Sequence, residues 1–241
     1  MPENRHGIGR GRFLETAGFG LAAVMAARTT GDALAAAPTS LERAASSPAH
    51  ALELLKEGNA RFAEGKASND TSLTARRLEV ANGQKPFAIV LGCSDSRVPL
   101  DTIFDQVPGH LFGVRVAGNF VNDDGLGSIE YGVAVLGAPL IVVLGHTACG
   151  AVDATIKYVE KGTAAPGHIM GLIKAIEPAA RATQGKPGTW LDDAIAANVR
   201  NNVAAIAARS SICSDAVKAK SVEIVGGVYD LHSGKVDFFP R

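Results

Sequence analysis

The sequence predicts an α/β fold with a mostly parallel central sheet flanked by helices. Three short runs of strand-forming apolar residues predict its core strands, at 87–91, 111–116 and 139–144. The first and third runs contain no polar residue, which is typical of strands buried on both faces of a parallel sheet. A helical segment between the second and third runs leaves room for the crossover that parallel strands require.

The remaining elements follow from periodicity and from chain breakers. Leu52, Leu55 and Phe62 recur on one side of a predicted helix. In chain order we expect a helix at 51–64, a glycine-rich loop at 118–127, helices at 128–136, 151–161, 169–182 and 191–209, and a terminal hairpin of strands at 221–229 and 235–239. No internal repeat is present, so these elements are expected to form one domain.

The first 37 residues resemble an export signal. Arg5, Arg10 and Arg12 precede a short apolar stretch at 17–27 and then small residues. The arrangement is similar to a twin-arginine signal, although Gly11 separates the two arginines. The apolar stretch is shorter than the roughly 20 residues of a membrane span. We therefore expect a periplasmic or secreted protein without a membrane span in the mature chain.

The expected domain organisation is a signal at 1–37, a linker at 38–49 and a single domain at 50–241. About 200 residues suffice for one α/β domain with a sizeable core. The alternative for the first segment is a helical arm that packs on a partner subunit of a cytoplasmic protein.

Charge and cysteine content exclude several classes of protein. Lysine and arginine number 24 and so do aspartate and glutamate, with no basic patch or acidic tail that would favour a nucleic-acid partner. The three cysteines give no disulfide framework. Cys213 has no partner at a metal-binding spacing, whereas the other two do.

Two short motifs carry the chemistry: Cys93-x-Asp95-x-Arg97 and His146-x-x-Cys149. Each follows the carboxyl end of a predicted buried strand, where open α/β sheets place their ligands. Two cysteines and one histidine suit zinc, and three ligands leave one tetrahedral position open for chemistry.

An aspartate and an arginine follow the first predicted ligand closely in sequence. Asp95 can accept a hydrogen bond, and Arg97 can hold that carboxylate ionised and oriented. Three other interpretations stay open. Asp95 could close the zinc site as a fourth ligand, Asp95 and Arg97 could form only a structural ion pair, or the cysteines could be ordinary buried thiols.

The chain resembles the β-class carbonic anhydrases. The resemblance rests on three segments: Gly92-Cys-Ser-Asp-Ser-Arg-Val-Pro99, Phe112-Gly-Val-Arg-Val-Ala-Gly-Asn119 and Gly145-His-Thr-Ala-Cys-Gly150. It implies one Zn2+ per subunit, with Cys93, His146 and Cys149 as metal ligands. It also implies that Asp95 and Arg97 form the catalytic pair.

The resemblance favours the plant-like subgroup of that family. Val90 occupies the position at which the other subgroup has tryptophan, and Gln84 resembles the glutamine that the plant-like subgroup directs at substrate. Phe112 and Tyr131 resemble its pocket-lining aromatic residues, and Gly150 its backbone donor. Ala117 departs from the pattern, in which valine is expected.

The implied activity is reversible hydration of carbon dioxide to bicarbonate and a proton by zinc-bound hydroxide, oriented by Asp95 and Arg97. The resemblance also implies a homodimer or higher homo-oligomer in which Gln84, Phe112 and Tyr131 partly serve the neighbouring subunit's zinc. Two alternatives remain: a hydrolase of carbon disulfide or carbonyl sulfide with the same fold, and a zinc-stabilised binding module without catalysis.

Overall fold

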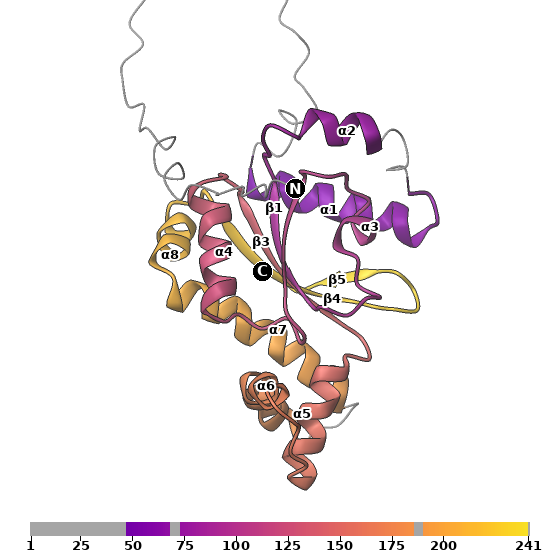
Figure 1. Ribbon diagram of the computed structural model, residues 1–241, viewed down its shortest axis with the longest axis vertical. Helices are drawn as coiled ribbons and strands as arrows, with labels where there is room; N and C mark the ends of the chain where they lie inside the picture. The colour runs from indigo at the N-terminus through magenta and orange to yellow at the C-terminus, as the bar shows by residue number, and fades with distance from the viewer. Residues whose placement is uncertain (1–46, 68–72, 186–189, 241) are drawn as a thin grey trace, which may run out of the picture. The chain divides into compact units, whose positions relative to one another are not determined.

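The computed structural model describes residues 47–67, 73–185 and 190–240 (Figure 1). A five-stranded sheet forms its centre, in the order β2-β1-β3-β4-β5. The strands are β1 (Ala88–Gly92), β2 (Leu111–Arg115), β3 (Leu140–His146), β4 (Glu223–Tyr229) and β5 (Val236–Phe238). Strands β1 to β4 run parallel to one another, and β5 pairs antiparallel with β4. The prediction of a mostly parallel sheet with a terminal hairpin is confirmed.

The helices of the described residues are α1 (Pro48–Ala63), α2 (Leu73–Glu79), α3 (Leu100–Ile103), α4 (Asp123–Ala134), α5 (Gly150–Lys161), α6 (Ile169–Thr183), α7 (Trp190–Arg209) and α8 (Ser211–Lys218). Those expected near α1, α5, α6 and α7 are confirmed within three residues at each end. Three short helices, α2, α3 and α8, had not been expected.

The loop expected at 118–127 is wrong over its second half, because α4 begins at Asp123. The side chain of Asn122 caps this helix by accepting a hydrogen bond from the Gly125 amide at 2.9 Å. Two aspartates in the first turn add a favourable interaction with the helix dipole. Capping therefore offsets the two glycines that suggested a loop.

Strands β1 and β3 at the centre of the sheet are buried on both faces, which explains their uninterrupted apolar sequences. Val90 and Val142 face one layer of the core together with α1 and α3. Ile89 and Ile141, their neighbours along the strands, face the opposite layer, which α4, α7 and α8 cover (Figure 1). All four side chains are fully buried, as the alternation of side chains along a central strand requires.

Pairing of β1 with β3 brings the two motifs together. Gly92 at the end of β1 lies opposite Leu144 on β3, so Cys93 and His146 emerge at the same edge of the sheet. Gly145, just before the histidine, allows α7 to approach closely. A Cβ at that glycine would lie 2.7 Å from Cγ2 of Val199.

The start of the described chain shifts one expected boundary. The side chain of Ser47 caps α1, which begins at Pro48, so the last two residues of the expected linker are helical. The expected signal at 1–37 lies outside the described residues. Within the ranges described, no helix has the length and apolar character needed to cross a bilayer.

Candidate metal centre

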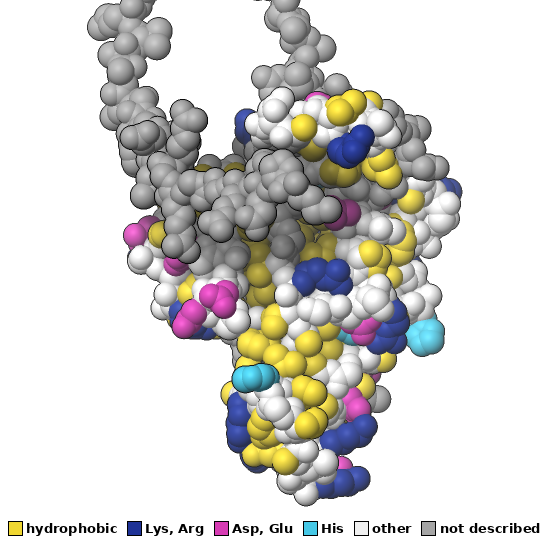
Figure 2. Space-filling model, viewed as in Figure 1, with side chains coloured by type: hydrophobic (Ala, Val, Ile, Leu, Met, Phe, Trp, Pro, Cys, Tyr) yellow, Lys and Arg dark blue, Asp and Glu magenta, His cyan; other side chains and the backbone are white. Residues whose placement is uncertain are grey.

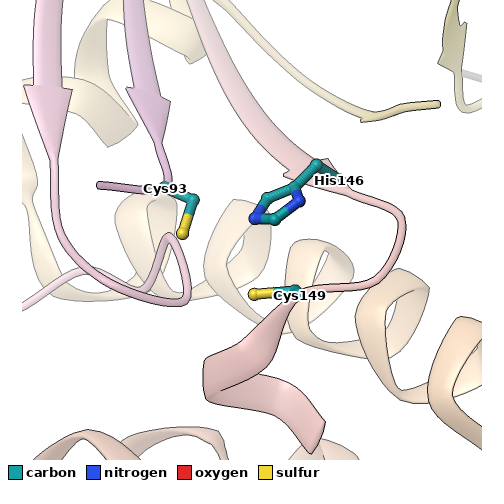
Figure 3. Close-up of side chains that lie close together, drawn as sticks. All are labelled: Cys93, His146 and Cys149. Atoms are coloured by element: carbon teal, nitrogen blue, oxygen red, sulfur yellow. The ribbon is translucent and has the colours of Figure 1, made fainter. Parts of the chain in front are cut away.

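Cys93, His146 and Cys149 converge on one point (Figure 3). Their ligand atoms all lie within 4.8 Å of one another, and all three residues are buried. Cys93 directly follows β1, His146 ends β3, and Cys149 directly precedes α5. The structure thus brings together the three residues that the two motifs predict as metal ligands.

The imidazole of His146 is prepared to bind a metal ion. Its Nδ1 lies 2.9 Å from the carbonyl oxygen of Thr147. Because a carbonyl only accepts, Nδ1 carries the proton and Nε2 presents a lone pair. Nε2 is buried and has no hydrogen-bond partner among the described residues, which is costly unless an ion fills the position. This nitrogen and two sulfurs fit zinc.

The interaction between the two sulfurs shifts their pKa values in opposite directions. The pKa of Cys93 is lowered to about 4, mainly by a hydrogen bond from the thiol of Cys149 and further by backbone hydrogen bonds. The same interaction raises the pKa of Cys149. Amide groups of Gly118 and Asp95 also donate to the Cys93 sulfur, at 3.3 and 3.5 Å. The site therefore already favours a thiolate, the form that binds metals.

The turn between His146 and Cys149 depends on an unusual backbone conformation. Ala148 has a φ of 53°, in the left-handed region that residues with a Cβ rarely adopt. Such a conformation costs on the order of 1 kcal/mol and is found mainly where a functional geometry requires it. Here it reverses the chain so that both ligands face the same point (Figure 3).

Asp95 lies beside the three ligands but is held by Arg97. The Arg97 backbone amide and Nε both donate to Oδ1 of Asp95 at 2.9 Å, and Nη2 donates to Oδ2 at 2.7 Å. These bonds hold the pKa of Asp95 well below its usual range. Oδ2 lies 3.9 Å from Nε2 of His146. The carboxylate is thus ionised, oriented and adjacent to the ligand atoms.

Arg115 is a further contact of this loop that the motifs did not reveal. Its Nε donates to the Cys93 carbonyl at 2.9 Å, and its Nη2 donates to the Asp95 carbonyl at 2.7 Å. Arg115 ends β2 opposite Gly92 on β1, so the sheet register places it beside the loop. Its position inside the second family-like segment was the available signal.

The expected pocket residues do not all reach this centre within one chain. Gly150 directly follows Cys149 at the start of α5. Gln84 is exposed and precedes β1, at the end of the strand opposite to Cys93. Phe112 and Tyr131 lie against each other, with ring centroids 6.2 Å apart, on β2 and α4.

Comparisons with known proteins agree with this site. A family model described as carbonic anhydrase matches residues 88–236, which include all five residues of the two motifs. Carbonic anhydrase 2 of Mycobacterium tuberculosis is 40% identical over 188 residues, which is 78% of this chain and 91% of that protein. The chain belongs to the β-carbonic anhydrase family. A carbonic anhydrase of Mycolicibacterium smegmatis is 38% identical over 192 residues, covering 80% of this chain and 93% of the relative.

Solved β-carbonic anhydrases share the fold. The Coccomyxa enzyme, in complex with acetazolamide, is 29% identical and superposes with a TM-score of 0.62 over 79% of this chain and 86% of that chain. One of two tetrameric β-carbonic anhydrases of Sordaria macrospora is 23% identical, with a TM-score of 0.62 over 80% of this chain and 98% of that chain, which shows the fold alone. The predicted family and fold class are confirmed.

Proposed function

We propose that this chain catalyses the reversible hydration of carbon dioxide to bicarbonate and a proton, with one zinc ion per subunit held by Cys93, His146 and Cys149. The observation that carries the proposal concerns the buried Nε2 of His146 in a member of this family. This nitrogen has no hydrogen-bond partner in the described part of the chain and lies close to two cysteine sulfurs. Zinc at such a site supplies a Lewis acid that lowers the pKa of bound water.

Asp95 and Arg97 act as an orienting pair in this proposal. The carboxylate of Asp95 would accept a hydrogen bond from the attacking hydroxide. This bond would direct a lone pair of the hydroxide toward carbon dioxide. Arg97 bonds both carboxylate oxygens, so Asp95 cannot rotate freely or take up a proton near neutral pH. Because Arg97 bonds both carboxylate oxygens, the proposal assigns zinc to Cys93, His146 and Cys149, and Asp95 would act beside the ion as the orienting group.

The remaining pocket residues are proposed to act across a homodimer. Phe112 lies on β2, an edge strand of the sheet, and Tyr131 beside it on α4 is 49% exposed. An aromatic pair at a sheet edge is typical of a surface that meets another chain. In this arrangement Gln84, Phe112 and Tyr131 complete the neighbouring subunit's site, while Gly150 offers its backbone amide within its own subunit.

Residues 1–37 are proposed to direct export, so that the mature enzyme acts in the periplasm or outside the cell. The basic start, the short apolar stretch and the small residues that follow support this location. Zinc loading before export would protect the ligand thiolates from oxidation. Sequencing the N-terminus of protein from cell fractions tests the proposal. An uncleaved start at Met1 in a wholly cytoplasmic pool would contradict it.

Stopped-flow measurement of carbon dioxide hydration by protein of known zinc content tests the activity. Cys149→Ser is the control, because it removes one ligand sulfur. Acceleration by the zinc-loaded chain and its loss in Cys149→Ser would support the proposal. A zinc-loaded chain that leaves the uncatalysed rate unchanged would overturn it, as would faster turnover of carbonyl sulfide or carbon disulfide in the same preparation.

A further inference from the structure

Two buried asparagines of α7 bind the loop that follows β2. Nδ2 of Asn198 donates to the carbonyl oxygen of Gly118 at 2.8 Å, and Oδ1 of Asn202 accepts from the Val121 amide at 2.8 Å. Asn202 also donates to the backbone carbonyl of Asn198 at 2.8 Å. Asn198 is 2% exposed and Asn202 is 7% exposed. The two amides form a hydrogen-bonded ladder between α7 and the loop, some 80 residues away in sequence.

The ladder ends at a metal ligand. Gly118, whose carbonyl accepts from Asn198, donates its own amide N–H to the sulfur of Cys93 at 3.3 Å. Its φ of +83° favours glycine, and an added Cβ would lie 2.4 Å from Cδ1 of Ile176. One residue, held in one conformation, therefore links the Asn198 amide to the ligand sulfur.

Packing alone does not explain Asn198. Its neighbours on the buried face of α7 include Ile195 and Val199, so an apolar side chain would be expected there. A buried amide lowers stability unless its hydrogen bonds are made. Those of Asn198 are directed at the loop and at Asn202. The polar side chain inside the core thus holds the backbone of Gly118 in place through a hydrogen bond.

We propose that Asn198 is a positioning residue of the metal centre: it fixes Gly118 so that its amide donates to the Cys93 sulfur. Such a hydrogen bond withdraws charge from a thiolate, and it thereby adjusts the strength and direction of the sulfur as a ligand. The inference rests on the proposed zinc site but not on turnover, because metal binding alone reports it.

Asn198→Ala tests the proposal, with Asn59→Ala as a matched control. Asn59 is likewise a buried asparagine, and its side chain joins backbone groups of Ile103, Gly234 and Val236, none of which is a metal ligand or bonds to one in these contacts. Zinc affinity is measured by competition with a chromophoric chelator, and the sulfur-to-metal absorption band is recorded after cobalt substitution. Asn198→Ala should weaken zinc binding about 10- to 100-fold and shift the band.

Asn59→Ala should lower the free energy of unfolding about as much as Asn198→Ala does. It should leave the zinc affinity and the cobalt absorption band as in the wild type. Unchanged zinc affinity and an unchanged band in Asn198→Ala would overturn the proposal, and so would equal changes in the two variants. If Asn198→Ala does not fold, Asn198→Ser takes its place. The wild type provides a second test, since the Gly118 amide proton should show scalar coupling to a spin-active cadmium ion bound in place of zinc.

Absence of that coupling in a cadmium-loaded wild type would contradict the Gly118-to-sulfur bond.

The zinc-affinity and absorption measurements separate this inference from the proposed activity. A protein that shows the Asn198 effect on metal binding but does not hydrate carbon dioxide would refute the activity alone. An active enzyme without the effect would refute the positioning role alone.

Discussion

Arg115 holds the backbone of the metal ligand Cys93: its Nε donates to the Cys93 carbonyl at 2.9 Å, from the end of the neighbouring strand. A second donor of the same guanidinium reaches the Asp95 carbonyl at 2.7 Å. One planar group on β2 therefore sets the spacing between a ligand and the carboxylate that orients the nucleophile.

Arg115→Met should lower kcat/KM about tenfold while zinc remains bound. Methionine keeps the apolar stem but cannot donate to either carbonyl, and hydrogen bonds from charged donors contribute about 1.5–3 kcal/mol. Stopped-flow rates and zinc content are measured together. Arg200→Met is the control. Arg200 is an exposed residue of α7, and its guanidinium lies over the ring of Phe239. Equal rates in the two variants would show that the contact has no part in catalysis.

Asp95→Ala should reduce kcat/KM by about 100-fold or more, the scale on which loss of orientation of a reacting group slows an enzyme. Arg97→Ala should cost less, since Arg97 acts through Asp95. The double variant should be no slower than Asp95→Ala alone, because residues acting as one unit are not additive. Additive losses in this double-mutant cycle would assign Arg97 an independent role.

Removal of zinc should lower the free energy of unfolding of the wild type. The ion binds the folded chain, whereas the unfolded chain has no preformed metal site. Thermal unfolding is followed with excess zinc and with chelator. With zinc at about 1,000 times its Kd the stabilisation is about 4 kcal/mol. Cys149→Ser should lose this difference. Cys213→Ser, which changes a buried cysteine outside the ligand group, should keep both the difference and the metal stoichiometry.

His110 should make the protein less stable as the pH falls from about 6.5 towards 4. Burial lowers the pKa of His110 to about 4, with a further decrease from Arg76 that Glu79 partly opposes. The unfolded chain takes up this proton near pH 6.5, before the folded chain does, so the stabilisation is complete above that pH and is lost below about 4.

Urea unfolding at several pH values measures the effect, which we expect to be on the order of 1–2 kcal/mol after allowance for solvent screening. His110→Gln should flatten the pH dependence relative to the wild type. His168→Gln changes an exposed histidine and should not. An identical pH dependence in the wild type and in His110→Gln would exclude His110 as its source.

The central strands and the ligands were predictable because each has a strong local signal. The uninterrupted apolar runs around Val90 and Val142 reflect burial on both faces of the sheet. The spacing of His146 and Cys149 reflects a single turn between a strand and a helix. In both cases the pattern and the physical requirement lie within a few residues.

The short helices were not predictable in the same way. A helix of two turns such as α8 offers too few residues for a 3.6-residue period to emerge. It is defined by its cap, in which the Ser210 hydroxyl accepts a hydrogen bond from the Cys213 amide at 3.0 Å. Likewise the start of α4 depends on Asn122 more than on its glycines.

The supporting contacts of the site depend on tertiary structure. Arg115 reaches Cys93 from the neighbouring strand, and Asn198 reaches Gly118 from a helix 80 residues away. The sequence does carry one sign of the second contact: Asn198 and Asn202 stand four apart, on the same face of α7 as Ile195 and Ile206. Polar residues at core positions indicate a specific partner, but only the structure identifies that partner.

The proton position on His146, the nitrogen ligand, is set by the backbone, whereas the cysteine sulfurs are affected by the residues around them. The proton of His146 sits on Nδ1 because the peptide oxygen of the very next residue, Thr147, faces it. Every amino acid supplies such an oxygen, so exchanging side chains around the pocket leaves the tautomer intact. Protein engineering could thus retune the cysteines through their surroundings, whereas changing the imidazole would require rebuilding the end of β3 itself.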